Sequence, residues 1–264
     1  MKKLTALLFS ALIILLVGCR TGTRVETPSP HPPTPAQEPS GEYEYTQPEP
    51  ENYVSVTPMI ALTFDDGPWV YTDHILDLLE QHNARATFFV LGYRVEWRPG
   101  TVTRAVDMGS EIASHTWTHL DLTRLSDEEI IYQIQAASAV IESVIGYSPR
   151  IYRPPFGLTT DRVQQISAHL GYSIVNWTLD TLDWRYRDAD TIYNAIMSTV
   201  QSGDVILLHD IYPSTVQAME RVIPSLIAEG YQLVTVSELL TYFYGELEPG
   251  VVYGRLTEPE LASN

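Results

Sequence analysis

The sequence predicts an α/β fold in which parallel strands alternate with crossover helices. From Pro58 onward, short runs rich in β-branched and aromatic residues alternate with longer stretches whose apolar residues recur every three or four positions. Acids, histidines and an arginine follow the ends of several strand-like runs, as is typical of the carboxyl edge of a parallel sheet. With 264 residues and 44% hydrophobic content, the chain is long enough for one such domain.

The first 19 residues have the pattern of a secretory signal. Lys2 and Lys3 precede an apolar run over residues 7–17, which ends at Gly18 and Cys19. The stretch from Leu16 to Cys19 resembles a bacterial lipobox, in which the cysteine becomes lipidated. An ordinary signal peptide with an incidental cysteine is the alternative. Because Cys19 is the only cysteine in the chain, we expect lipidation there and an extracytoplasmic protein that contacts a bacterial membrane through this anchor alone.

Residues 20–57 form a tether in this interpretation. They hold eight of the 18 prolines, are rich in Glu, Thr and Ser, and show no sustained apolar period. Such composition is typical of a disordered segment that lifts a domain away from a membrane. A retained pro-segment is the alternative, but nothing in the segment has the pattern of a packing element.

Residues 58–244 are expected to form the single folded domain, and residues 245–264 a C-terminal tail with little periodicity. Ser126 and Glu129 have the spacing of a capping box and mark a helix start. The expected strands are 59–64, 86–91, 111–114, 151–153, 172–178, 204–208 and 231–234, and the expected helices are 72–82, 127–145, 160–170, 189–201 and 214–229.

The charge of the chain excludes one class of partner. The formal net charge is −17, so a nucleic-acid partner is not expected. Acidity favours solubility but identifies no substrate, and the oligomeric state is not predicted.

Two adjacent acids, Asp65 and Asp66, stand where the first strand meets a Gly-Pro turn. Neighbours on a strand point to opposite sides, so the two carboxylates are expected to divide their roles, one binding a metal ion and the other acting as general base. A glycosidase would need its two carboxyl groups roughly 5 Å or more apart, on opposite sides of the scissile bond. The adjacency therefore favours a metal-dependent hydrolase.

His115 and His119 lie four residues apart and are close enough to share one ion if the segment is helical or tightly coiled. With Asp66 they would give two nitrogens and one oxygen, which leaves a position open for water, as in catalytic zinc sites. Cobalt or nickel would also suit these ligands. A metalloprotease is disfavoured, because the residue after the first histidine is Thr116 instead of glutamate.

Five motifs in this order resemble those of the polysaccharide deacetylases of carbohydrate esterase family four, the NodB-homology domain. The resemblance covers about residues 58–244 and implies a distorted, incomplete (β/α) TIM-like barrel of about seven strands that hydrolyses N-acetyl or O-acetyl groups of a glycan. The motifs are TFDDGP at 63–68, HTWTH at 115–119, RPPFG at 153–157, DW at 183–184 preceded by Asp180, and LLHD at 207–210.

Carried over position by position, the resemblance makes Asp66, His115 and His119 the metal ligands and Asp65 the base, in agreement with the reasoning from the residues. It also implies that His209 is the general acid, oriented by Asp183, and that Arg153 holds Asp65 ionised. The backbone N–H of Phe156 would stabilise the oxyanion, and Trp184 and Leu207 would line the pocket for the acetyl methyl group. Taken singly, each of these residues also has an ordinary structural interpretation.

We expect the substrate to be peptidoglycan, because a tethered enzyme outside the membrane meets cell-wall glycan first. Chitin oligomers, acetylated xylan or an exopolysaccharide fit the motifs equally well. The alternative from another class is a non-catalytic glycan-binding lipoprotein on the same fold. Trp69, Tyr93 and Trp97 are candidates for a sugar-stacking groove, although such residues more often pack in a core.

Overall fold

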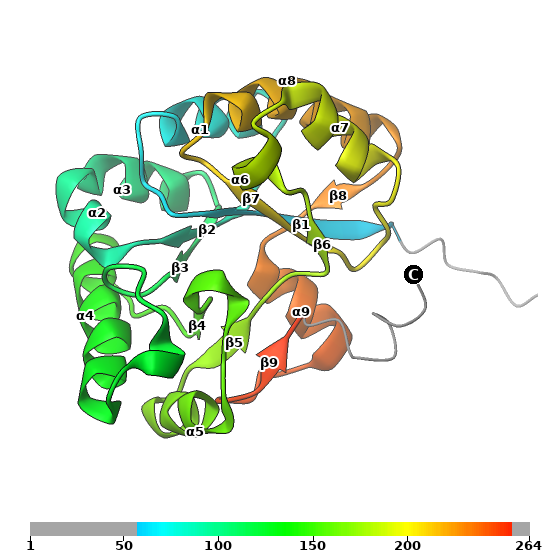
Figure 1. The fold of residues 1–264 in the computed structure, drawn as a ribbon. Coiled ribbons are helices and arrows are strands. Elements are labelled where there is room, and N and C mark those ends of the chain that lie inside the picture. Colours follow the sequence, from blue (N-terminus) through cyan, green and yellow to red (C-terminus); the bar gives the residue numbers. More distant parts are fainter. Residues whose placement is uncertain (1–56, 255–264) are drawn as a thin grey trace, which may run out of the picture. The chain divides into compact units, whose positions relative to one another are not determined.

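A curled, open sheet of parallel strands organises the molecule (Figure 1). The computed structural model describes residues 57–254, and within them the strand order is β6-β7-β1-β2-β3-β4-β5-β9, with β8 paired to the start of β1. The outer strands β6 and β9 are the two ends of this order, so the barrel is incomplete, which confirms the predicted fold class. The strands are β1 Met59–Asp65, β2 Thr87–Val90, β3 Glu111–Ser114, β4 Ile151–Tyr152, β5 Ser173–Val175, β6 Leu179–Asp180, β7 Val205–His209, β8 Gln232–Leu233 and β9 Val252–Tyr253.

Most of the helices cover the outer face of the sheet and lie between successive strands in the chain (Figure 1). The last helix, α9 Val236–Tyr244, packs on the inner face instead, where Val236, Leu239 and Leu240 cluster with Ala61 and Phe89. The described helices are α1 Thr72–Gln81, α2 Gly92–Trp97, α3 Pro99–Asp107, α4 Asp127–Ile145, α5 Asp161–Leu170, α6 Asp183–Tyr186, α7 Ala189–Met197, α8 Pro213–Ala228 and α9 Val236–Tyr244, with 3₁₀ turns η1 Leu122–Arg124 and η2 Pro155–Gly157. No helix among these residues is both long and apolar enough to cross a membrane.

The central strand β1 shows how residue alternation builds the site. Ile60, Leu62 and Phe64 are fully buried in the core beneath the helices, where Phe64 stacks on Phe88 at 5.3 Å between ring centroids. The alternate positions, including Asp65, face the inside of the curled sheet, because successive side chains of a strand point to opposite faces. The same pattern that buries the apolar residues therefore turns Asp65 toward the interior.

The predicted capping box at the start of α4 is confirmed. The Ser126 hydroxyl accepts a hydrogen bond from the Glu129 N–H, and the Glu129 carboxylate accepts one from the Ser126 N–H. Gly146 ends the helix with a φ of 84°, a left-handed conformation that glycine adopts at little energetic expense.

The structure adds elements that the sequence pattern did not predict. Helices α2, α3 and α9 occupy stretches without a predicted element, and the segment after Val175 bends before it enters β6. Residues 245–264 were expected to be a tail, but Val252 and Tyr253 form β9, which pairs with β5. A two-residue strand gives no readable period, so only tertiary pairing reveals it. Cys19, the signal and nearly all of the tether lie outside the described residues.

Candidate active site

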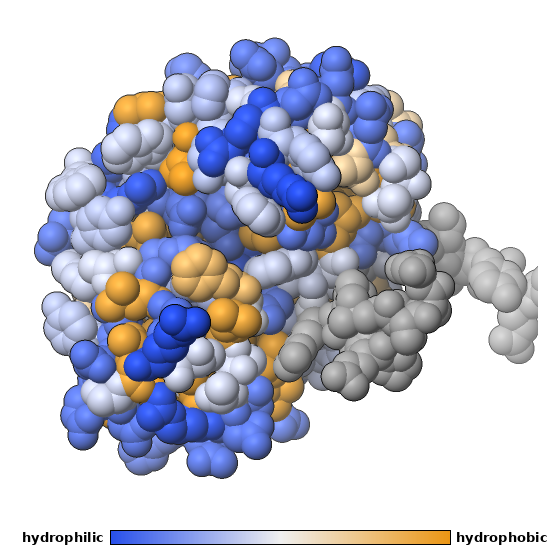
Figure 2. All heavy atoms as spheres, viewed as in Figure 1, coloured by the Kyte–Doolittle hydropathy of each residue, from blue (hydrophilic) through white to orange (hydrophobic). Residues whose placement is uncertain are grey.

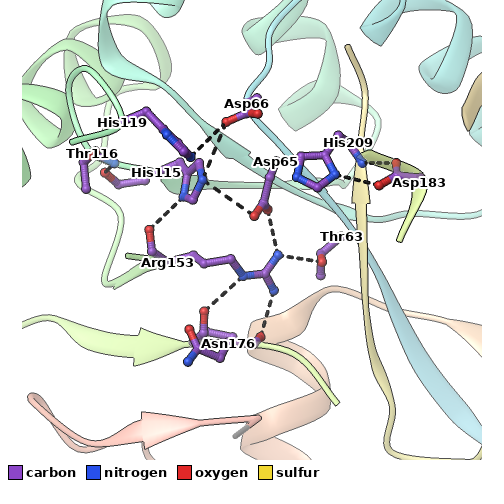
Figure 3. A network of polar contacts seen from close by, with 12 residues as sticks. Thr63, Asp65, Asp66, His115, Thr116, His119, Arg153, Asn176, Asp183 and His209 are labelled. Atoms are coloured by element: carbon purple, nitrogen blue, oxygen red, sulfur yellow. Dashed lines mark hydrogen bonds and ion pairs between the residues drawn. The ribbon is translucent and has the colours of Figure 1, made fainter. Parts of the chain in front are cut away.

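A cavity of about 450 Å³ lies at the carboxyl ends of β1 and β7. All the predicted site residues of the domain line it, except Arg153 and Asp183, and each of these two bonds to a lining residue (Figure 3). The motifs therefore converge in space although they span almost 150 positions. The lining residues are Asp65, Asp66, His115, His119, Phe156, Trp177, Asp180, Trp184, Leu207, His209 and Tyr212.

The two adjacent acids point to different partners. Asp65 is the last residue of β1 and bonds to Arg153, while Asp66 faces the two histidines (Figure 3). Asp66 has a φ of 73°, so the chain turns sharply at this residue. A left-handed turn keeps both carboxylates at the same end of the sheet, where an extended backbone would have sent them to opposite faces.

Asp66, His115 and His119 form a cluster that could hold a metal ion, with one donor atom from each residue within 4.8 Å of the others. The Nε2 atoms of His115 and His119 lie 3.7 Å and 3.5 Å from Oδ1 of Asp66. These separations resemble the roughly 3.4 Å between two ligand atoms that bind one ion tetrahedrally at about 2.1 Å. Oδ1 of Asp66 is buried and has no hydrogen-bond partner within residues 57–254. The donor set therefore fits a divalent cation.

The protonation state of His115 suits a ligand. Burial lowers its pKa to about 3, so the ring is neutral at physiological pH. Nδ1 donates to the carbonyl of Arg153 at 2.8 Å, which leaves the lone pair on Nε2, facing Asp66. In metal-binding histidines one ring nitrogen typically donates to a carbonyl or carboxylate, as Nδ1 does here, while the other nitrogen binds the metal.

The loop from His115 to His119 is neither helical nor simply extended. Thr116 and His119 have φ values of 70° and 61°, and a positive φ is rare for a β-branched residue such as threonine. Neighbouring elements hold this conformation: Gln133 of α4 bonds to Thr118 through its amide, and the Gly92 N–H donates to the carbonyl of Thr116. The close approach of the histidines thus depends on the loop backbone.

Arg153 is fully buried directly behind Asp65. Its guanidinium donates to Oδ1 of Asp65 at 2.7 Å, to the Thr63 hydroxyl at 2.9 Å, and to the carbonyls of Val175 and Asn176 (Figure 3). Burial raises the pKa of Asp65, and the charge and hydrogen bond of Arg153 oppose that rise. The ion pair favours the carboxylate form of Asp65, whereas burial of the side chain favours the protonated form and is the larger influence on its pKa.

His209 faces the cavity from the end of β7 and is held by Asp183 on its other side. Nδ1 of His209 bonds to Oδ1 of Asp183 at 2.7 Å, and Oδ2 accepts from the His209 N–H and the Thr215 hydroxyl. Burial lowers the pKa of His209, but the hydrogen bond and charge of Asp183, with the charges of Asp65 and Asp66, outweigh it and raise the pKa to about 9. The ring therefore carries a proton at neutral pH.

Phe156, Trp184 and Leu207 border the same cavity in different ways. Leu207 is buried, whereas 62% of Phe156 and 45% of Trp184 are exposed to solvent. Phe156 has a φ of 61° and its ring lies 4.7 Å from that of His119, while its N–H has no acceptor in the described chain. Figure 2 shows hydrophobic residues gathered over the loop between β4 and α5, where Phe156 and Leu158 are exposed.

Several site residues escaped the sequence analysis. Tyr212 and Trp177 line the cavity, and Tyr212 lies three positions beyond β7. Functional residues tend to follow the ends of parallel strands, and this rule would have indicated Tyr212 even though it lies outside the motifs. Asp180, which the fourth motif includes but to which no role was given, lines it too. Arg94 holds the backbone of the acid turn by donating to the carbonyl of Asp66 at 2.8 Å.

Trp69, Tyr93 and Trp97 do not line this cavity. Instead, Arg94 stacks on Trp69, and Tyr93 packs edge-on against Trp97 at 5.0 Å.

Comparison with known proteins identifies relatives over the same region. The polysaccharide deacetylase family model matches residues 54–175. A peptidoglycan-N-acetylglucosamine deacetylase of Bacillus cereus is 40% identical over 190 residues, which make up 70% of this chain and 89% of that protein. A solved structure of T48 deacetylase with substrate has a TM-score of 0.71 and 38% identity, covering 75% of this chain and 96% of that one.

A longer relative matches as well. A peptidoglycan-N-acetylmuramic acid deacetylase of Bacillus subtilis is 42% identical over 182 residues, or 69% of this chain. The chain spans only about two fifths of that relative's length, 38%.

Proposed function

Because the chain belongs to the polysaccharide deacetylase family, we propose that it is a hydrolase that removes N-acetyl groups from a glycan, with the amino sugars of peptidoglycan as its substrate. The relatives named above include deacetylases of N-acetylglucosamine and of N-acetylmuramic acid in peptidoglycan. One observation carries the proposal: a set of metal donors with a carboxylate beside it faces a protonated histidine across one cavity.

Asp66, His115 and His119 would hold the metal ion, which we propose to be zinc, with cobalt or nickel as replacements. When bound, such an ion polarises the acetyl carbonyl and lowers the pKa of a water molecule.

Asp65 is the proposed base. Its Oδ1 is engaged by Arg153, whereas Oδ2 lies 3.7 Å from Nε2 of His115, beside the metal donors. Oδ2 is thus the oxygen available to accept a proton from the attacking water, and Arg153 orients the carboxylate for that task.

His209 is the proposed acid. Since Nδ1 bonds to Asp183, the proton on Nε2 is the one it can deliver to the leaving nitrogen when the amide bond breaks. The free N–H of Phe156 would stabilise the negative charge on the carbonyl oxygen, and Trp184 and Leu207 would enclose the acetyl methyl group.

We also propose that Cys19 is lipidated, so that the enzyme is held outside the cytoplasm on a bacterial membrane, within reach of the cell wall. The lipobox-like residues 16–19 support this anchor, and the net charge of −17 argues against a nucleic-acid partner. Globomycin, which blocks processing of lipoprotein signals, should leave the precursor uncleaved, and Cys19→Ala should abolish incorporation of labelled palmitate into the protein.

Acetate release tests the activity. The purified full-length protein is incubated with peptidoglycan, chitin oligomers and acetylated xylan, with and without a chelator and added zinc. We expect chelator-sensitive release from peptidoglycan, and Asp65→Asn serves as the inactive control. If acetate were released only from chitin oligomers or only from acetylated xylan, that glycan would replace peptidoglycan as the proposed substrate. If the protein bound zinc but released no acetate from any glycan, the glycan-binding alternative would be favoured.

A further inference from the structure

Arg187 is an exposed cation beside the cavity that has no acidic partner among residues 57–254. Seven of the eleven arginines in this range form ion pairs, but Arg187 does not. The nearby acids are engaged elsewhere: Asp188 caps α7 by accepting from Thr191, and Asp190 pairs with Arg221. In a chain of net charge −17, a cation without a partner at this position is notable.

Two residues that line the cavity hold Arg187 in place. Its guanidinium carbon lies 3.4 Å from the ring centroid of Tyr212, and its Nε donates to the carbonyl of Trp184 at 2.8 Å. The backbone is left-handed here, with a φ of 51°, which turns the side chain back toward these two residues. Stacking on an aromatic face fixes the plane of a guanidinium. Apart from Tyr212 itself, no acceptor for the two terminal nitrogens of Arg187 lies within residues 57–254.

The position of this cation relative to the proposed acid indicates what it could bind. The centroid of the Tyr212 ring lies 5.8 Å from that of His209, the proposed general acid. Tyr212 therefore contacts the Arg187 guanidinium and also lies next to the His209 ring. If His209 protonates the acetamido nitrogen of a sugar, then a substituent on the adjacent ring carbon lies within a few bonds of that nitrogen. A planar guanidinium with free N–H groups matches a carboxylate.

We infer that Arg187 binds a carboxylate carried by the substrate next to its acetamido group, so that the enzyme prefers an acidic amino sugar such as N-acetylmuramic acid to neutral N-acetylglucosamine. This inference rests on the proposed function and specifies the substrate of the same site. It assigns Arg187 a role in specificity and no part in the proton transfers.

The test compares substrates that differ in one charge. The glycans are peptidoglycan strands freed of stem peptides, the same strands with the lactyl carboxylate converted to a methylamide, and chitin oligomers. We expect the protein to have a kcat/KM about three- to fivefold higher for acetate release from the free acid than from the methylamide, and Arg187→Gln to bring that ratio close to one.

Arg185→Gln is the matched control, because Arg185 also lacks an acidic partner in the described chain but stacks on Tyr186, which does not line the cavity. It should keep the wild-type ratio. The inference would be overturned if Arg187→Gln kept the wild-type ratio of kcat/KM between the free acid and the methylamide, or if both variants lowered this ratio equally. Either result would leave the deacetylase assignment unaffected. Absence of acetate release from all three glycans by the wild-type protein would instead refute the proposed function on which the inference rests.

Discussion

The substitution Asp183→Asn should move the alkaline limit of activity. Asp183 accounts for the largest influences that raise the pKa of His209 to about 9, against burial, which lowers it. Without the Asp183 charge, burial should bring the pKa to its ordinary value of about 6.5 or below, a loss of about 3 kcal/mol in stabilisation of the imidazolium. At pH 7.5 the protonated fraction would fall from nearly all molecules to about one tenth or less.

The assay is the pH dependence of kcat on an N-acetylated sugar. A general acid must be protonated, so the wild-type rate should fall as the pH rises through about 9, whereas the variant should fall near or below neutral pH and be about tenfold slower at pH 7.5. An activated acetate ester, whose leaving group needs no proton, should lose much less. An alkaline limit that stays near pH 9 in the variant would refute the role of Asp183, and equal losses on both substrates would refute the acid role of His209.

Three further predictions concern the opposite side of the cavity and the acid turn. Asp65→Asn should keep stoichiometric zinc, measured by elemental analysis, and lose at least about a hundredfold in kcat, because base catalysis is lost while the ligands remain; retained turnover would contradict the assignment. His119→Ala should lose both bound metal and activity, and a variant that kept stoichiometric zinc would show that the ligand set is wrong. Gly67→Ala should lower the free energy of unfolding by about 1–3 kcal/mol in a denaturant titration, because the added methyl group would lie 2.3 Å from Oδ2 of buried Asp210. Gly100→Ala, where nothing lies within 4 Å, is its control and should be neutral or slightly stabilising.

Much of the fold was predictable because long periodic elements carry their own signal. Strand β1 alternates, the 19-residue helix α4 begins with a capping box, and both lie where the sequence placed them. Short elements carry no such signal. Helix α2 has six residues and ends two positions before Pro99, and β9 has two residues and is followed by Gly254, so each depends on tertiary contacts.

The identities of most site residues could also be predicted from the sequence, but their orientation and burial could not. The motifs identify the acids and histidines of the site. Their orientation depends on the left-handed backbone at Asp66 and Thr116, and a sequence predicts such a conformation only where the residue is glycine. Desolvation was equally hidden: burial raises the pKa of Asp65, and the sequence analysis expected only the opposing influence of Arg153. Tyr212 and Arg187 lie outside every motif, so only the cavity reveals them.

The burial of Arg153 has a consequence for how mutations in this protein would be tolerated. Asp65→Asn would keep an oxygen that can accept the hydrogen bond from buried Arg153, but loss of Arg153 would leave the buried Asp65 carboxylate and the carbonyls of Val175 and Asn176 without their donor. Breaking a buried ion pair by removing one partner typically destabilises a protein by about 3–5 kcal/mol, a large share of the total stability of a domain. A mutant at this position would therefore be expected to disappear from the cell through proteolysis, instead of surviving as a folded protein that binds glycan without cleaving it.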